Sequence, residues 1–95
     1  MQILLSEFGT ILVSRPAGKE AFLILQTRLS VLPKTEKIEI NFTGVQALTP
    51  SWADEFVTPL LERYAERVIL QNTENASVKA TLEILQEQKT AQSKS

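Results

Sequence analysis

The residues best suited to chemistry lie between Thr43 and Glu55, in the stretch TGVQALTPSWADE. Ser51 stands three residues before Asp54, a spacing that is typical of the first turn of a helix. Free backbone N–H groups at a helix start stabilise an anion, so a phosphoryl group on Ser51 or Thr49 would be stabilised there. These two hydroxyl groups are therefore candidate phosphorylation sites.

A purely structural explanation of the same residues is also available. The Ser-x-x-Asp spacing of Ser51 and Asp54 approximates a capping box, in which each side chain accepts a hydrogen bond from a backbone donor of the first turn. Pro50 restricts Thr49 to an extended conformation and so fixes how the chain enters the helix. In this interpretation Ser51 and Asp54 stabilise the helix, and neither has to contact a ligand.

The functional interpretation is a surface that binds another molecule. Trp52 follows the expected cap. A tryptophan there is more often half-buried under a loop, but an aromatic side chain beside a loop is also a candidate interface contact. For Arg15, near the start of an earlier helix, the hypothesis is a salt bridge with Asp54 that ties the starts of the two helices together, and the alternative is an exposed arginine with no fixed partner. The partner-binding residues expected in the loop at 43–52 and the turn after it are Thr43, Gln46, Thr49, Ser51, Trp52 and Glu55.

Composition argues against several kinds of site. The 95 residues include no histidine and no cysteine, which removes a Ser-His-Asp triad, a thiol nucleophile and the usual zinc ligands. Asp54 and Glu55 point about 100° apart on a helix, which is a poor arrangement for a general acid and base. The isolated glycines form no phosphate-binding loop. We therefore expect a protein that is not an enzyme, with no cofactor and no metal site.

Charge and hydropathy bear on partners and location. Ten basic and eleven acidic residues give a net charge of −1, and the basic residues are scattered, which argues against nucleic acid. No apolar run approaches the roughly 18 residues of a membrane span, and the first residues do not resemble a signal peptide. We expect a cytoplasmic protein with no membrane partner, and a homodimer is compatible with these features.

Strand and helix signals alternate along the chain and would position these residues. Strands are predicted at residues 2–6, 11–13, 37–42 and 67–72, with the second paired to the first. Helices are predicted at about residues 14–32, 51–66 and 76–88, capped by Ser14 or Arg15, by Ser51, and by Asn75. In KIEINF, Ile38, Ile40 and Phe42 alternate with polar residues, as in a strand that is covered mainly on one face.

The order β(β)αβαβα predicts a small α/β domain at residues 1–88. Its sheet is expected to be mixed or mostly parallel, with about four strands and with helices mainly on one face. The polar tail at residues 89–95 is predicted to be frayed or disordered. Binding regions of such sheets usually lie where strands end and helices begin, which here means Ser14 to Pro16 and Thr43 to Glu55.

The stretch GVQALTPSWADEF, with IEINF before it and VILQN and ASV after it, resembles the STAS-like domains of unknown function. These are distantly similar to the STAS domains of bacterial anti-sigma-factor antagonists. FG…LVSR, from Phe8 to Arg15, resembles the N-terminal signature of the same family, and the resemblance extends to about Leu85. It implies a STAS-type sheet flanked by helices, a cytoplasmic regulatory role and a protein partner, with an ATPase-domain kinase as one candidate.

The sequence departs from the antagonists at the position that matters for their switch. In that family the helix opens with Asp-Ser-Ser-Gly-Leu, and the first serine receives a phosphate from the kinase. Pro50 stands at this serine, Ser51 aligns with the second one, and Asn41 replaces an aspartate at the end of the preceding strand. The resemblance thus carries over the location of a surface. A small-anion or nucleotide sensor that uses the same helix start and Arg15 is the alternative function.

Overall fold

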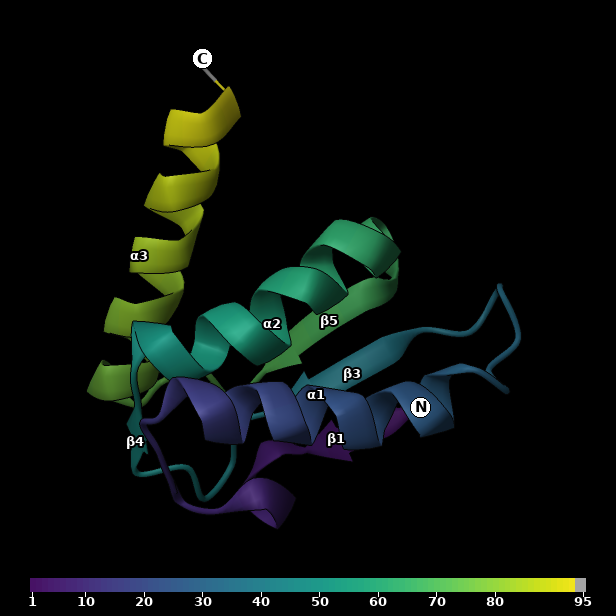
Figure 1. Cartoon of the computed structure of the whole chain (residues 1–95), viewed down its shortest axis with the longest axis horizontal. Coiled ribbons are helices and arrows are strands. Elements are labelled where there is room, and N and C mark those ends of the chain that lie inside the picture. Colours follow the sequence, from purple (N-terminus) through teal and green to yellow (C-terminus); the bar gives the residue numbers. More distant parts are fainter. Residues whose placement is uncertain (94–95) are drawn as a thin grey trace.

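The computed structural model of the chain describes the backbone of residues 1–93 and the side chains of residues 1–88. These residues form a small α/β domain with three α-helices and two parallel sheets, of three and two strands (Figure 1). The prediction of an α/β domain with mostly parallel strands is confirmed. The tail predicted at residues 89–95 lies outside the part of the chain whose side chains are described. Within the described residues, no helix is both long enough and apolar enough to cross a membrane.

The larger sheet is formed by three strands: β1 (Gln2–Leu4), β3 (Ile38–Asn41) and β5 (Val68–Gln71). Their order is β1-β3-β5, and both pairings are parallel. The alternation predicted for the central strand is confirmed, because Ile38, Ile40 and Phe42 are buried while Glu39 and Asn41 are partly exposed. One face of this sheet therefore belongs to the core and the other does not.

The smaller sheet pairs β2 (Ile11–Leu12) with β4 (Ala47–Leu48), again in parallel. Two predictions are therefore wrong: residues 11–13 do not pair with the first strand, and the strands do not form one sheet. After β1 the chain enters a short 3₁₀ helix (Leu5–Phe8) and then Gly9, whose φ of +128° only glycine adopts readily. This turn directs the chain away from β1 before β2 begins. β4 is missing from the predicted strands because two residues carry no readable alternation.

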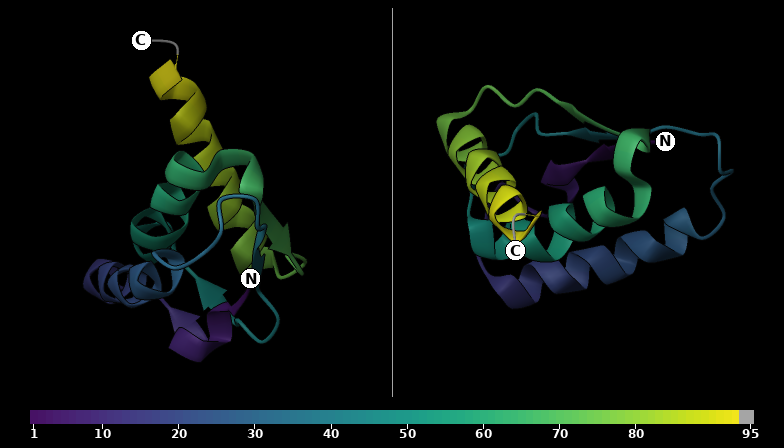
Figure 2. Two further views of the ribbon diagram at one scale, coloured as in Figure 1. Left: turned by 90° about the vertical axis from the view of Figure 1, so that its right-hand side faces the viewer. Right: turned by 90° about the horizontal axis from the view of Figure 1, so that it is seen from above.

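The helices are α1 (Arg15–Leu29), α2 (Pro50–Tyr64) and α3 (Ala76–Ser93). α1 and α2 lie side by side on one side of the three-stranded sheet, and α3 stands at the end of this layer, next to α2 and β4 (Figure 2). α2 ends earlier than predicted because Ala65, at a φ of +41°, leaves the helical conformation. Each helix starts after a strand or the turn that follows it. Because the paired strands run parallel, their carboxyl ends lie at the same end of the molecule, and so do the starts of the three helices (Figure 1).

The core lies between the helical layer and the larger sheet, and Phe56 is at the centre of its aromatic residues. Its ring stacks on that of Trp52, with centroids 4.9 Å apart and an angle of 27° between the planes. The rings of Phe8 and Phe22 lie 5.4 Å and 6.4 Å from the Phe56 ring, in tilted and edge-to-face arrangements. Aromatic pairs at these distances add to the stabilisation that burial alone gives.

Side chains at the start of α3 cover the outer edge of β4. Asn75 Oδ1 accepts hydrogen bonds from the backbone N–H groups of Ser77 and Val78, which confirms its predicted capping role. Ser77 Oγ accepts a hydrogen bond from the Leu48 N–H at 2.9 Å and donates to the Leu48 carbonyl at 3.1 Å. Thr81 Oγ1 donates to the same carbonyl at 2.5 Å. The backbone N–H and carbonyl groups on the open edge of a strand normally have no partner in the sheet. Here the side chains of α3 supply the hydrogen bonds that another strand would make with Leu48.

Candidate functional site

The first part of the candidate site is the start of α1. Ser14 has an extended backbone, and its Oγ accepts a hydrogen bond from the Ala17 N–H at 3.2 Å, so Ser14 is the cap. Pro16 lies in the first turn, where its missing N–H breaks no helical hydrogen bond. Arg15 follows the cap directly, and its side chain is therefore free to extend toward the neighbouring helix.

The second part is the start of α2, and it differs from the prediction. Thr49, with φ −105° and ψ 157°, precedes the helix, and Pro50 takes the first helical position. Proline favours this position and an extended residue before it, which is why the helix begins before Ser51. The predicted capping box of Ser51 and Asp54 is therefore wrong. The Thr49 hydroxyl does not cap the helix either, because it donates to the Val13 carbonyl at 2.9 Å.

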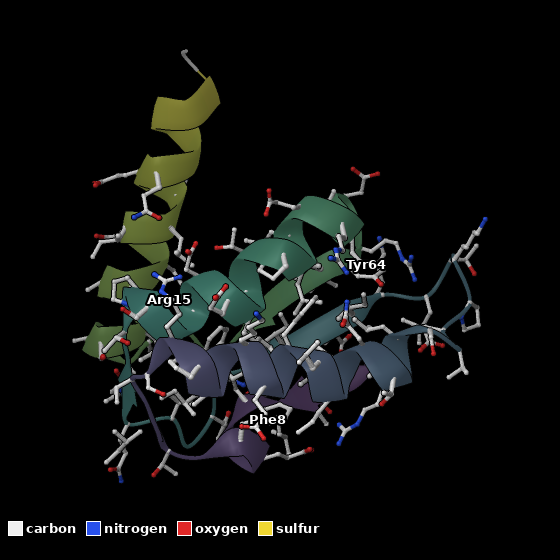
Figure 3. The ribbon with its side chains drawn as sticks, viewed as in Figure 1. Phe8, Arg15 and Tyr64 are labelled. Atoms are coloured by element: carbon white, nitrogen blue, oxygen red, sulfur yellow. The ribbon has the colours of Figure 1, made fainter. Side chains whose placement is uncertain are left out.

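An ion pair connects these two helix starts. Arg15 lies at the start of α2 (Figure 3), with its Nη1 3.0 Å from Asp54 Oδ2 and 3.8 Å from Glu55 Oε1. The predicted salt bridge between Arg15 and Asp54 is thus present. Their side chains are 51% and 37% exposed, so another molecule can reach both. The guanidinium of Arg15 and the carboxylates of Asp54 and Glu55 together carry a net negative charge.

Trp52 does not belong to the accessible surface. It is only 1% exposed, its ring lies against Phe56, and its backbone is in close contact with Gly18 of α1. The helix turns Trp52 toward the core and leaves Ser51 and Asp54 on the other side, where both are partly exposed. Trp52 therefore has no surface to offer a partner, which corrects the expectation that it is a binding residue.

The loop after β3 is held by a cluster of polar groups. Asn41 Oδ1 accepts three hydrogen bonds, from the Thr43 N–H at 2.9 Å, from the Thr43 hydroxyl at 2.7 Å and from Asn72 Nδ2 at 2.8 Å. Thr43 is thus fixed at the end of the larger sheet, although its residue is exposed. Asn72 is absent from the predicted site, and the only signal for it is an asparagine directly after a strand, a residue type that tolerates its φ of +58°.

Gln46 lies beside the beginning of β2 and the cap of α3, where its carbonyl accepts a hydrogen bond from Asn75 Nδ2 at 3.3 Å. Its backbone N–H donates to the Thr10 carbonyl at 2.8 Å, which places it beside the beginning of β2, and its residue is exposed. The structure thus brings five of the predicted residues to the starts of α1 and α2. Gln46 lies beside the beginning of β2, and Thr43 is tied through Asn41 to Asn72 at the carboxyl ends of β3 and β5. We call the group of five the helix-start surface: Arg15, Thr49, Ser51, Asp54 and Glu55.

Two exposed apolar residues, one on β2 and one directly after it, are absent from the predicted site. Ile11 and Val13 are 63% and 47% exposed, while Leu12 between them is buried. Val13 borders the surface directly, because its carbonyl accepts the hydrogen bond from Thr49. The signal in the sequence is the apolar run ILV in a short strand, since a strand that buries its middle residue turns both neighbours outward.

The chemistry available at the helix-start surface is that of hydrogen bonding and charge. Within the part of the chain that the structure describes, no group of three or more His, Cys, Asp or Glu side chains is placed to hold a metal ion. Comparisons with models of protein families, with curated proteins and with solved structures found no match to this chain. The resemblance to STAS-like domains therefore stays a prediction.

Proposed function

We propose that this chain is a non-catalytic regulatory module that binds a protein partner through the helix-start surface and Gln46. The observation that carries the proposal is the exposure of Val13 directly beside Thr49, with Ile11 also exposed two residues earlier on β2. Apolar side chains within a polar rim are the usual composition of a protein-binding patch. Ile11 and Val13 thus take the role of apolar contact that the sequence suggested for Trp52.

The polar groups of the surface suit a protein partner. Arg15 is half exposed, and its guanidinium has N–H donors beyond those used with Asp54, which a carboxylate or carbonyl of a partner would accept. The Ser51 hydroxyl makes no hydrogen bond within the described part of the chain, and Ser51 is partly exposed. The buried ring of Trp52 fixes the turn that carries these groups, and a surface that is already ordered loses little entropy on binding.

The resemblance to STAS-like domains supports the same function. It implies a cytoplasmic regulatory role and gives an ATPase-domain kinase as one candidate for the partner. Of the two candidate phosphorylation sites, Ser51 is the better one in this geometry. Thr49 already donates its hydroxyl hydrogen to the Val13 carbonyl, and a phosphoryl group on Thr49 would remove that hydrogen bond.

The alternative function, a small-anion or nucleotide sensor at the same helix start, has less support. Its cation would be Arg15, which already lies 3.0 Å and 3.8 Å from the carboxylates of Asp54 and Glu55. These three groups carry a net negative charge, which repels an added anion. We expect no change in melting temperature on addition of phosphate, ATP or GTP.

Photo-crosslinking tests the proposed function. A photoreactive amino acid at Val13 or at Gln46 is expected to form an adduct with one and the same protein in native cell extract, and mass spectrometry identifies that protein. The control places the same amino acid at Glu66, an exposed residue just after the far end of α2. Equal adducts at all three positions, or none at Val13 and Gln46, would contradict the proposal.

The identified partner is then purified, and its affinity for variants of the chain is measured by calorimetry. Val13→Glu is expected to weaken binding at least about tenfold, because it places a charge in the apolar centre of the patch. Glu66→Gln is the matched control and should bind as the unchanged chain does. Equal melting temperatures show that a loss of binding does not come from unfolding.

A further inference from the structure

α1 carries apolar side chains on two opposite faces. Phe22 and Leu25 are buried in the core, whereas Leu23 and Ile24 between them are 54% and 49% exposed. The run AFLIL at residues 21–25 thus places apolar groups all round the helix, a pattern that is typical of a helix covered on every side. In both views of Figure 2, α1 lies at the margin of the molecule, with no other part of the described chain beyond it.

The exposed residues of this outer side have a regular spacing. Ala17, Ile24 and Val31 follow one another at intervals of seven residues, so they lie along one line of the helix and its end. All three are exposed, and Val31, which lies just past the end of α1, is 83% exposed. We call this side the outer α1 face and define it by its exposed residues: Ala17, Glu20, Leu23, Ile24, Thr27, Arg28 and Val31.

The charges of the outer α1 face are complementary to themselves. Glu20 and Arg28 stand four residues before and four residues after Ile24, which is about 6 Å along the helix in each direction. When a second α1 lies antiparallel across Ile24, the Glu20 of each copy therefore meets the Arg28 of the other. Arg28 Nη1 also lies 3.3 Å from Glu7 of its own chain, and a guanidinium has enough donors for both carboxylates.

We propose that the outer α1 face binds a second copy of this chain, with the two α1 helices antiparallel about a two-fold axis at Ile24. The contact is isologous, since the same residues contribute from both copies. Ile24 meets Ile24 at the axis, Leu23 extends the apolar contact beside it, and Val31 of each copy lies against Ala17 of the other. Arg15 extends toward α2 to reach Asp54, so the helix-start surface stays free in this dimer.

One pair of helices provides a small interface, below the roughly 1,200 Å² of a standard stable complex. We therefore expect a weak dimer with a dissociation constant in the micromolar range. Sedimentation velocity over micromolar to millimolar protein concentrations measures this constant. Ile24→Glu is expected to raise it at least about tenfold, because it places two like charges at the axis. The matched control is Ile84→Glu, which changes a partly exposed isoleucine of α3 and should leave the dimer unchanged.

A charge exchange tests the antiparallel arrangement itself. Glu20→Arg and Arg28→Glu should each weaken the homodimer, because each places like charges together twice. An equimolar mixture of these two variants should associate more tightly than either variant alone, since every Glu20–Arg28 contact between them again joins opposite charges. Thermal denaturation of each variant shows that it is folded. A chain that stays monomeric at all these concentrations, or a mixture no tighter than its components, would overturn the proposal.

Discussion

The first turns of α2 have two sides that differ in kind. On the inner side, Trp52 is buried, stacks on Phe56 and lies against Gly18 of α1. On the outer side, Ser51 and Asp54 are partly exposed. Neighbouring residues of a helix point about 100° apart, so one continuous stretch of sequence serves the core and the surface at once. The comparison shows that closeness in sequence is a poor guide to which residues act together.

The inner side also determines where the outer side lies. Arg15 reaches Asp54 only because α1 and α2 approach closely, and Gly18 permits that approach. A Cβ atom at Gly18 would lie 3.0 Å from Trp52 Cα and still closer to the Trp52 carbonyl oxygen. The packing of the inner side is thus a condition for the ion pair on the outer side. Substitutions on the inner side should therefore lower the free energy of unfolding more than substitutions on the outer side.

Trp52→Ala is the change with the largest expected effect. It removes a fully buried ring and its stacking on Phe56, so we expect the free energy of unfolding to fall by about 3–5 kcal/mol. Because Trp52 is the single tryptophan of the chain, urea unfolding should be followed by circular dichroism and not by fluorescence. Trp52→Phe keeps an aromatic ring and should cost less. A loss below about 1 kcal/mol for Trp52→Ala would show that the ring is not part of the core.

Gly18→Ala is expected to have an intermediate effect. Alanine favours a helix over glycine by about 1 kcal/mol, but the added methyl group meets the backbone of Trp52, which cannot move aside as a side chain can. We expect a net loss of about 1–2 kcal/mol in the free energy of unfolding, from overpacking. Urea unfolding measures it, with Ala80→Gly at an exposed position of α3 as the control for helix propensity. A Gly18→Ala chain as stable as the unchanged one would mean that α1 and α2 separate at little cost.

The features that the sequence predicts correctly depend on a few neighbouring residues. Asn75 caps α3, as an asparagine before a helical pattern predicts, and Ile38 and Ile40 face the core because a strand alternates. The Arg15–Asp54 salt bridge follows from two helix starts that meet at one end of the molecule. These conclusions need only local rules and the order of the elements.

The features that escape prediction depend on contacts between distant segments. β2 pairs with β4 and not with its neighbour β1, and that choice depends on where the intervening helix packs. Ser77 and Thr81 bond the backbone of Leu48, a function that no pattern in α3 indicates. The inward direction of Trp52 depends on the close approach that Gly18 permits. Because Gly18 belongs to a different helix, the residues around Trp52 do not indicate this contact.

Arg15→Ala has the smallest expected effect on stability. The ion pair is exposed on both sides, so water and salt weaken it, and we expect a loss of under about 1 kcal/mol in the free energy of unfolding. Urea unfolding at low and at high salt should show a difference from the unchanged chain only at low salt. By contrast, partner affinity should fall clearly, since a charged group at a binding surface contributes more once a partner excludes water.

Arg28→Ala is the control for Arg15→Ala, because it removes another exposed ion pair, that of Arg28 with Glu7 at 3.3 Å. Both variants are measured at concentrations below the dissociation constant of the proposed α1 dimer, so that Arg28 contributes no contact between copies. We expect a similarly small loss of stability for this variant but unchanged partner affinity. If instead Arg15→Ala lowers the free energy of unfolding by more than about 2 kcal/mol, the Arg15–Asp54 ion pair contributes mainly to the stability of the fold. The helix-start surface would then stabilise the fold, as Trp52 does, and the two sides of α2 would differ in exposure but not in role.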